Sequence, residues 1–359
     1  MARHPEPQGD PARMRPVRTS SVTITDVARR AGVSMKTVSR VLNAEPRVRT
    51  EVRELVKQAA KELRYRPKLS ARSLAGSRSY VVGYLLTDPS IPYNSYAQLG
   101  ALQACRAAGY HLLVEAVNLG APDLGAEIDR LLGSIAVDGF LLVPPTCDNL
   151  AILDALDAAG VTYVRISPAL DPGRSALVEL DDRQAAYDMT VHLLDLGHRR
   201  IGFVVGDPRH SAARNREAGY RLALASRGVE VDTQLIRQGY FTFRSGYEAG
   251  ETMLAEPGRP TAVFASNDAM ALGVMAAAQK RGLVVPRDLS VAGFDDTPSA
   301  SMVWPGLTTV RQPIVDMAAA ATEMIIAQSS RKGRSEPPPQ LIFQSELAIR
   351  GSTAAPPRH

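Results

Sequence analysis

A segment near the amino terminus has the residue types and the spacing that reading of DNA requires. Ile24, Val27 and Ala31 fall on one helical face, Gly32 permits a sharp turn, and Ser34 is a good N-cap for a second helix. Two short helices joined by a glycine-containing turn, inside a strongly basic segment, form a helix-turn-helix. A plain helical hairpin with a polar face is the alternative.

The outward face of the second helix carries side chains that suit contact with bases. Arg40 can pair with guanine through two hydrogen bonds, Lys36 can reach guanine or a phosphate, and Met35 can contact a thymine methyl group. Hydroxyl groups beside them suit phosphate oxygens. The DNA-binding residues predicted for this head are Thr25, Met35, Lys36, Thr37, Ser39, Arg40 and Asn43.

A short segment after the head is a second candidate for DNA contact. A third helix is expected over roughly 50–63, capped by Thr50 and stopped by Pro67. Residues 69–75 can form one more short helix, but seven residues cannot hold a helix alone in water. Paired with a twin copy and docked on DNA, this segment would place Leu74 as an apolar wedge in the minor groove. An ordinary flexible linker fits the same spacing.

The distribution of charge indicates which end of the chain meets polyanions. Residues 1–78 hold 18 of the 42 lysines and arginines but only 7 of the 37 acidic residues, so the rest of the chain is net acidic. A basic head on an acidic body predicts that only the head contacts nucleic acid. Residues 1–20, rich in proline and arginine, are expected to be a disordered basic arm, although Met14 could also start the chain.

The rest of the chain alternates short apolar runs with amphipathic helical runs. About eleven strands are expected between 81–86 and 342–349, with helices between them that several glycines end. This alternation predicts parallel sheets covered by helices on both faces, and eleven strands are too many for one ordinary sheet of that kind. The predicted fold class is an all-α helix-turn-helix DNA-binding head plus an α/β two-lobed core of two doubly wound parallel sheets.

Several motifs, taken in order, resemble those of the lactose-repressor/galactose-repressor (LacI/GalR) family. The head and hinge resemblance lies in TITDVARRAGVSMKTVSRVLN, YRP and ARSLAGSRS. It continues through LGHRRIGFV, SAARNREAGY, FASNDAMALG, LSVAGFDDTP and PGLTTVRQP, and so covers about residues 22–350. The resemblance implies a hinge helix and a core like that of periplasmic sugar-binding proteins. It also implies dimers on DNA and a ligand between the lobes that alters operator affinity.

The resemblance divides the chain into five segments. They are a disordered basic arm (1–20), a helix-turn-helix domain (21–67), a hinge helix or linker (68–78), an effector-binding core (79–350) and a disordered tail (351–359). Lobe 1 is expected at about 79–174 and 308–338, and lobe 2 at about 175–307 and 339–350. Because the tail has no apolar heptad repeat, a dimer is favoured over a tetramer.

The resemblance also assigns roles to individual residues. Met35, Lys36 and Arg40 match the base-reading positions, and Leu74 matches the hinge leucine that intercalates at the operator centre.

In the core, the same comparison predicts an effector site. Asp268 matches an acidic effector ligand, Arg216 matches the arginine facing it, and Phe241 falls where relatives place an aromatic ring against the ligand. Tyr93 and Asp295 are looser matches. A carboxylate after a strand accepts sugar hydroxyls while a guanidinium donates to them. Alternatively, Asp268 only caps its helix, Arg216 only forms a surface ion pair, and Phe241 only packs in the core.

Other classes of protein fit the sequence less well. GxGxxG, GxxxxGK[ST], GxSxG and HExxH are absent, the histidines are scattered, and Cys105 and Cys147 form no CxxC pair. We therefore expect no enzyme activity, metal or cofactor. A transport binding protein would need a secretory signal and no DNA-binding head, and a ligand-free architectural protein would be favoured by loss of Asp268 and Arg216.

The function expected is that of a transcription regulator, expected to repress, in the bacterial cytoplasm and associated with the nucleoid. Its expected partners are pseudo-palindromic double-stranded operator DNA, a second copy of the chain and a small effector, with no membrane contact. A sugar or sugar derivative is the base expectation for the effector, and a nucleobase is the alternative. Whether the effector induces or co-represses is left open.

Overall fold

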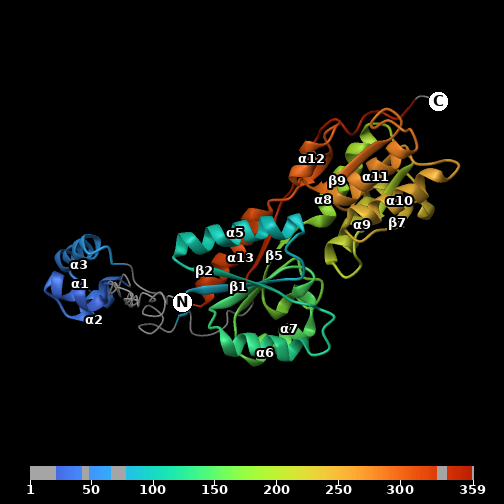
Figure 1. Ribbon diagram of the computed structural model, residues 1–359. Coiled ribbons are helices and arrows are strands. Elements are labelled where there is room, and N and C mark those ends of the chain that lie inside the picture. The colour runs from blue at the N-terminus through green and yellow to red at the C-terminus, as the bar shows by residue number, and fades with distance from the viewer. Residues whose placement is uncertain (1–21, 43–47, 66–77, 330–337, 358–359) are drawn as a thin grey trace, which may run out of the picture. The chain divides into compact units, whose positions relative to one another are not determined.

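The chain forms two compact units, residues 1–77 and 78–359 (Figure 1). The computed structural model describes residues 22–42, 48–65, 78–329 and 338–357. The predicted arm, Asn43 and all of the hinge before residue 78, including Leu74, lie outside these ranges.

The first unit is built on three helices in its described part. They are α1 (Ile24–Ala31), α2 (Met35–Leu42) and α3 (Thr50–Glu62). Their buried apolar faces meet in a small core formed by Val27, Ala28, Val38, Val41, Val56 and Ala59. Gly32 ends α1 in the left-handed conformation, with φ +66°, as a turn between two short helices requires. The expected cap of α3 is one residue off, because Arg49 stands at the N-cap and Thr50 is already helical.

The second unit contains two six-stranded sheets in its described part. The first sheet, in the order β11-β5-β4-β3-β1-β2, is parallel throughout. Its strands are β1 (Val81–Leu86), β2 (His111–Ala116), β3 (Gly139–Leu142), β4 (Tyr163–Ile166), β5 (Ala176–Leu180) and β11 (Gln340–Phe343). We call this sheet and its helices lobe 1.

The second sheet, in the order β12-β10-β9-β8-β6-β7, is parallel except for the antiparallel edge strand β12. Its strands are β6 (Ile201–Val205), β7 (Ile236–Gln238), β8 (Ala262–Ala265), β9 (Ser290–Asp295), β10 (Thr308–Arg311) and β12 (Glu346–Ala348). We call this sheet and its helices lobe 2.

Helices cover both faces of each sheet. In lobe 1, α5 (Pro92–Ala108) and α13 (Ile314–Gln328) pack together on one face, and α6 (Leu124–Ser134) and α7 (Leu150–Ala158) form the other layer. In lobe 2, α8 (Asp182–Asp195) pairs with α9 (Ser211–Ser226), and α10 (Phe243–Ala255) pairs with α11 (Asp268–Lys280). The short elements are α12 (Pro298–Met302), η1 (Thr146–Asp148), η2 (Pro172–Arg174) and η3 (Thr233–Leu235). The two-lobed α/β core is therefore confirmed.

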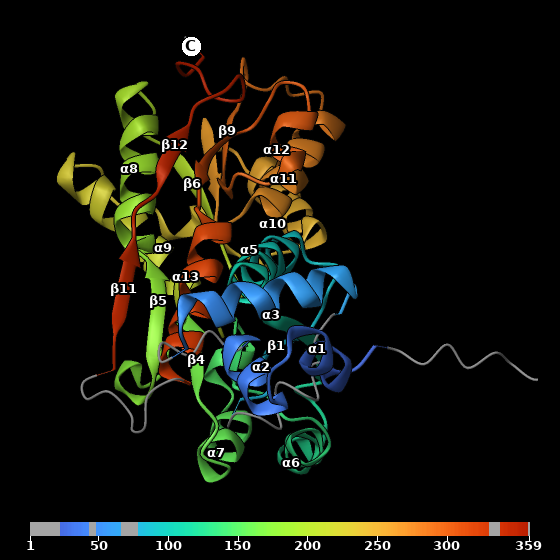
Figure 2. The same cartoon turned by 90° about the vertical axis from the view of Figure 1, so that its left-hand side faces the viewer.

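The expected lobe boundaries are wrong: at each of the three points where the chain passes from one lobe to the other, one strand is assigned to the wrong lobe. β5 and β11 belong to the sheet of lobe 1, where they lie side by side (Figure 2). β10 belongs to the sheet of lobe 2. The run predicted as one strand over 342–349 is divided into β11 and β12, which lie in different sheets. A short apolar run predicts a strand, but it carries no information about which sheet accepts its hydrogen bonds.

The expected disordered tail is also wrong for its first residues. Ser352 is fully buried, its Oγ accepts from Thr308 N at 2.8 Å, and its backbone carbonyl accepts from Val291 N at 2.9 Å. Ala354 O accepts from the His198 ring at 2.9 Å. The tail begins with small polar residues that form no apolar pattern, so its sequence does not predict these hydrogen bonds with lobe 2.

Candidate functional site: a DNA-reading head and an inter-lobe cleft

The exposed face of α2 carries the side chains predicted to read bases. Met35, Lys36 and Arg40 are exposed, as is Thr25 on the neighbouring helix α1. The Thr25 hydroxyl donates to the Met35 sulfur at 3.3 Å, so these two predicted contacts share one surface. The head therefore presents a thioether and two cations on one helix, which suits contact with base edges in a major groove.

The start of α2 is fixed by a cap that the sequence predicts. Ser34 Oγ accepts from Thr37 N at 3.2 Å and lies 2.9 Å from Thr37 Oγ1. Thr37 and Ser39 are half-buried, in contrast to Met35 and Arg40. The Thr37 hydroxyl is thus already within hydrogen-bond distance of Ser34, and a DNA phosphate would have to share this hydroxyl.

Two further contacts hold α1 in place. Asp26 accepts from Thr23 N at 2.9 Å and from Thr23 Oγ1 at 2.7 Å, and these hydrogen bonds lower the pKa of the Asp26 carboxyl. Arg30 forms an ion pair with Glu62 of α3 at 2.5 Å. The first and third helices are therefore held together by an ion pair as well as by the apolar core that they share with α2.

Arg216 of α9 is the centre of a buried polar cluster in the core. Its Nε donates to Asp182 Oδ1 at 2.7 Å, and its Nη1 donates to the Ser266 carbonyl at 2.5 Å. Nη1 also lies 3.8 Å from Asp295 Oδ1, and the guanidinium carbon lies 3.5 Å from the centre of the Phe294 ring. The cluster stands at the carboxyl ends of β8 and β9, where open α/β sheets bind ligands.

Asp295, at the end of β9, is a carboxylate of this cluster whose Oδ1 lies 3.8 Å from Arg216 Nη1. Burial raises the pKa of Asp295, and the carboxylates of Asp268 and Asp182 raise it further, while Arg216 and a 2.6 Å hydrogen bond from Gln312 oppose the shift. Its φ of +115° is a conformation that side chains other than glycine rarely adopt. Strain and burial at one carboxylate are typical of a functional position.

Asp268 does not face Arg216 as expected. Its Oδ2 accepts from Thr297 N at 2.7 Å and from Thr297 Oγ1 at 2.9 Å, and its Oδ1 accepts from Thr309 Oγ1 at 2.5 Å. Nor does Asp268 cap α11, since the side chain of Asn267 performs that role. Both oxygens of Asp268 are occupied by protein donors, so the partners of Arg216 are the carboxylates on α8 and β9 instead.

Phe241 packs against two of the buried apolar clusters of the core and also lies near Arg216. Its ring fills the space beside Gly206, where a Cβ atom would come within 2.1 Å of it. The ring centre lies 5.2 Å from that of His210 and 6.0 Å from the Arg216 guanidinium. The φ of Phe241 is +60°, and Asn267 holds its carbonyl with a 3.1 Å hydrogen bond. This geometry is compatible with an aromatic wall for a ligand beside Arg216.

Tyr93 brings lobe 1 to the same cluster. It lies in the first turn of α5, and burial raises the pKa of its phenol, with the charges of Asp182 and Asp295 adding to the rise. The structure therefore brings together Tyr93, Arg216, Phe241 and Asp295 from the predicted effector set. Asp268 stands behind them.

Sequence reasoning missed Asp182 and Ser266. Asp182 is buried, and the signal for it was an Asp-Asp pair directly after the β5 strand and at the start of α8. Ser266 follows β8, is fully buried, and its Oγ has no hydrogen-bond partner in the described part of the chain. A buried hydroxyl without a partner beside Arg216 suits a site that a polar ligand or water completes.

The two lobes also touch directly. Ser211 Oγ, at the start of α9, donates to the Ser167 carbonyl of lobe 1 at 2.8 Å. His210 is largely buried next to this contact, and burial lowers its pKa. The cleft thus has a polar rim, which any opening of the lobes would break.

Residues of both lobes line one cavity. It has a volume of about 490 Å³ and lies where β1, β2 and β3 end, with one wall from lobe 2. Its lining residues are Thr87, Ala116, Val117, Asn118, Leu119, Gly120, Pro145 and Arg209. This size falls within the range of small-molecule pockets.

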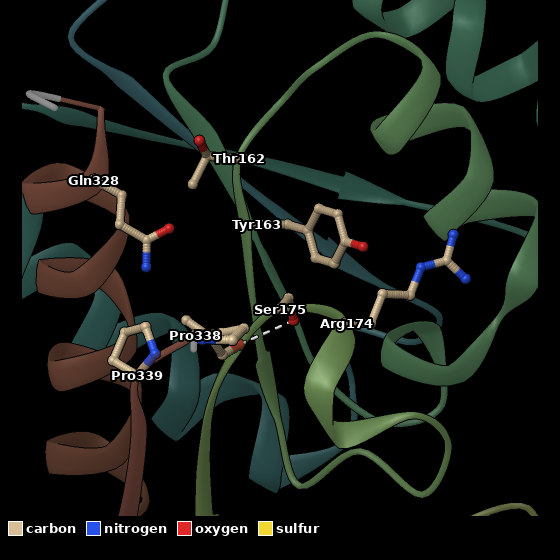
Figure 3. Close-up of a pocket in the computed structure, with 8 residues that line it drawn as sticks. Thr162, Tyr163, Arg174, Ser175, Gln328, Pro338 and Pro339 are labelled. Carbon is tan, nitrogen blue, oxygen red and sulfur yellow. Dashed lines mark hydrogen bonds between the residues drawn. The ribbon is translucent and has the colours of Figure 1, made fainter. Parts of the chain in front are cut away.

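A second cavity, of about 40 Å³, lies at the opposite edge of the sheet (Figure 3). Gln328 of α13 stands on one side of it, and Tyr163 and Arg174 stand on the other. Arg174 is already paired with Asp154 at 2.5 Å and with Asp157 at 2.8 Å. Because this cavity is small and lies at the amino ends of β4 and β5, it does not suit the effector.

No group of three or more His, Cys, Asp or Glu side chains in the described ranges could hold a metal ion. No helix within the described residues is long and apolar enough to cross a membrane.

Comparison with known proteins gives matches along most of the chain. Residues 23–68 match the family described as bacterial regulatory proteins, lacI family, and residues 190–353 match a periplasmic binding protein-like domain. The chain is 33% identical over 334 residues to the HTH-type transcriptional regulator DegA of Bacillus subtilis (strain 168), which covers 92% of this chain and 98% of that relative.

Solved structures give the same architecture. The transcriptional regulator CelR–cellobiose complex matches with a TM-score of 0.71 and 30% identity, over 92% of this chain and 99% of that one. The lac repressor dimer bound to operator and the anti-inducer ONPF matches with a TM-score of 0.75 and 28% identity, over 93% of this chain and 99% of the other.

Proposed function

Because the chain belongs to the LacI family of bacterial regulatory proteins, we propose that a sugar or sugar derivative, bound between its lobes, sets its affinity for operator DNA. The protein is a DNA-binding transcriptional regulator, and it acts as a dimer on its operator. Its site of action is the bacterial cytoplasm, on the nucleoid, and its effect on transcription is repression.

The observation that carries the effector proposal is the buried cluster around Arg216. Arg216 stands 3.8 Å from Asp295 Oδ1, and the aromatic rings of Tyr93 and Phe241 belong to the same cluster. A carboxylate that accepts hydroxyls, a guanidinium that donates, and aromatic rings for the apolar face are what a pyranose needs. The similar regulator CelR forms a complex with cellobiose, which supports a sugar as the effector.

Within the predicted effector set, the roles divide. We assign direct contact with the effector to Tyr93, Arg216, Phe241 and Asp295, and we add Asp182, which holds Arg216 in place. Asp268 has a supporting role, because its oxygens hold the segment around Thr297 next to Asp295. The effector would therefore meet Asp268 only through its neighbours.

On the DNA side, specificity is assigned to Met35, Lys36 and Arg40 on α2. Phosphate contacts are assigned to Thr25, Thr37, Ser39 and Asn43, and Leu74 is assigned to the minor groove. The exposure of Met35, Lys36 and Arg40 supports base contact, and the basic composition of the head supports attraction to phosphates.

Calorimetric titration of the full chain with monosaccharides and disaccharides, and with purines as a second panel, tests the proposal. Asp295→Asn should lower sugar affinity about tenfold, because an amide NH₂ that only donates replaces one carboxyl oxygen facing the ligand and leaves a buried polar group of the ligand without its partner, at a cost of about 1–3 kcal/mol. Operator binding without effector should remain. If the wild-type protein binds purines but no sugar, the effector is a nucleobase and not a sugar. If Asp295→Asn binds the sugar as tightly as the wild type does, the cluster around Arg216 is not the effector site.

A further inference from the structure

A carboxylate next to Asp295 ties the cluster around Arg216 to the carboxyl-terminal part of the chain. Asp296 directly follows β9, and its side chain is only 9% exposed. Its Oδ1 accepts from Arg350 Nη2 at 2.6 Å, and its Oδ2 accepts from Arg311 Nε at 2.7 Å. Burial raises the pKa of Asp296, but the hydrogen bonds from the two arginines outweigh burial and hold this pKa below its usual value. Asp296 is therefore an anion held by two distant segments.

The backbone at this point is strained over two consecutive residues. The φ of Asp295 is +115° and that of Asp296 is +57°, and both values lie where residues other than glycine are rare. Such conformations persist only where the surroundings hold them. Gln312 Nε2 donates to the Asp295 side chain at 2.6 Å, and the two arginines hold the residue that follows. The direction in which Asp295 points thus depends on how firmly Asp296 is held.

Of the two arginines, Arg350 is the better anchored. Its side chain is 24% exposed, against 54% for Arg311, and water screens exposed ion pairs. The second guanidinium nitrogen of Arg350, Nη1, donates to the Leu307 carbonyl at 2.8 Å, and its backbone N–H donates to Thr308 Oγ1 at 2.9 Å. Thr308 is fully buried. The fixed fork of Arg350 therefore joins Asp296 to the segment that enters β10.

The chain just after Arg350 is fastened to the other end of the same strand. Ser352 Oγ donates to the Val291 carbonyl at 2.5 Å, and the Ser352 carbonyl accepts from Val291 N at 2.9 Å. Val291 lies near the start of β9, and Asp296 lies directly after its end. Residues 350–352 therefore hold β9 at both ends, and this fixes the position from which Asp295 leaves the sheet.

We infer that Arg350 is a positioning residue for the effector: through Asp296, it holds Asp295 in the orientation that meets the ligand. The inference rests on the proposed function, in which Asp295 contacts the effector directly. Arg350 acts without touching the ligand, so its removal should change effector affinity only where Asp295 is present.

Calorimetric titration of the full chain, with cellobiose and the other sugars and with the purine panel, measures this role. Arg350→Gln removes the charge and keeps most of the side-chain volume. It should weaken binding of whichever probe binds the wild type by about 3- to 30-fold. Arg311→Gln is the matched control, because it removes the other cation from the same carboxylate, and it should weaken binding less than about threefold. Wild-type affinity in Arg350→Gln, or equal losses in the two variants, would refute the inference.

Double variants separate positioning from a merely structural role. Added to Asp295→Asn, Arg350→Gln should change affinity by less than about twofold, because the contact through which it acts is already altered. Asp296→Asn should reproduce the loss of Arg350→Gln and add little to it, and it also serves as the test if Arg350→Gln does not fold. Losses that simply add in either pair would overturn the inference.

Hydrogen–deuterium exchange without a probe gives a readout that does not depend on the effector. Backbone amides of residues 294–307 should exchange faster in Arg350→Gln than in the wild type and in Arg311→Gln. Unchanged exchange would refute the inference even if sugars bind. If purines bind and sugars do not, the sugar is wrong, and the variants are judged with the purine. If neither panel binds, the proposed effector is wrong, and exchange alone decides whether Arg350 holds this segment.

Discussion

Replacing Asp268 with alanine should destabilise the core while sparing the direct contacts of the effector. The carboxylate accepts three hydrogen bonds, two from Thr297 and one from Thr309, and both threonines are buried. A buried donor left without a partner costs about 1–3 kcal/mol, so the sum of three is an upper bound. The two hydroxyls can turn to other acceptors, whereas the Thr297 N–H cannot.

Burial reduces the expected loss further. It raises the pKa of Asp268 to about 6, which means that the folded core already disfavours the charged carboxylate, and alanine removes that cost. The remaining loss in the free energy of unfolding is about 2–4 kcal/mol. Urea unfolding followed by circular dichroism measures it. The matched control is Asp295→Ala, whose one hydrogen bond from Gln312 predicts a smaller loss in stability but a large loss in sugar affinity.

A definite result would refute this reasoning. If Asp268→Ala unfolds like the wild type but no longer binds the effector, Asp268 contacts the ligand directly and the division of roles is wrong. If both variants lose stability and affinity together, the two carboxylates act as one unit, and a double-mutant cycle should then give a large coupling energy.

Three further predictions concern DNA reading and pH. Arg40→Ala should cost about 1–3 kcal/mol on cognate operator and relax one base position, because bidentate recognition is lost, and equal losses on cognate and random DNA in a binding assay would contradict it. Leu74→Ala should weaken operator binding in the same assay, because the wedge at a central pyrimidine–purine step is lost. Its effector affinity and dimerisation should match the wild type, and a loss of either would argue against a role confined to DNA. Asp295→Asn should gain stability relative to the wild type as the pH rises above 3.8. Burial raises the pKa of Asp295 in the folded state, so the folded protein keeps the Asp295 proton to a higher pH than the unfolded chain does. The contribution of Asp295 to the free energy of unfolding therefore falls as the pH rises. Urea unfolding of both proteins at pH 5 and pH 8 measures the difference, and a constant difference would mean that burial does not raise this pKa.

The sequence predicts the local elements of this chain well, because each depends on nearby residues. Ser34 caps α2 and Gly32 ends α1 as expected, and alternating strands and helices do form two lobes. What the sequence could not supply was the assignment of strands to sheets. β5 pairs with β4 and β10 pairs with β9, the strands just before them, whereas β11 pairs with β5, which lies far away in the chain. A local apolar pattern does not say whether a strand joins the sheet of the preceding strand or another sheet.

The site shows the same limit in its side chains. A carboxylate after a strand can serve a ligand or the protein, and only the neighbours decide which. Thr297 and Thr309 come 29 and 41 residues after Asp268, and they take its oxygens. Asp295, by contrast, keeps a face toward Arg216. The motif alone ranks Asp268 above Asp295 as an effector ligand, and the proposed division of roles reverses that order.

The three passages of the chain between the lobes restrict how the core can move. They follow β5, β10 and β11, so three separate short stretches of the chain connect the two lobes. Because hinges are a few residues at loops or element ends, a change in the angle between the lobes would have to be absorbed in these three connectors together. The DNA-binding unit is attached by the chain to lobe 1 alone, since β1 follows it directly. Along the chain, any signal that an effector produces in lobe 2 therefore has to pass through lobe 1 before it reaches the DNA-binding unit.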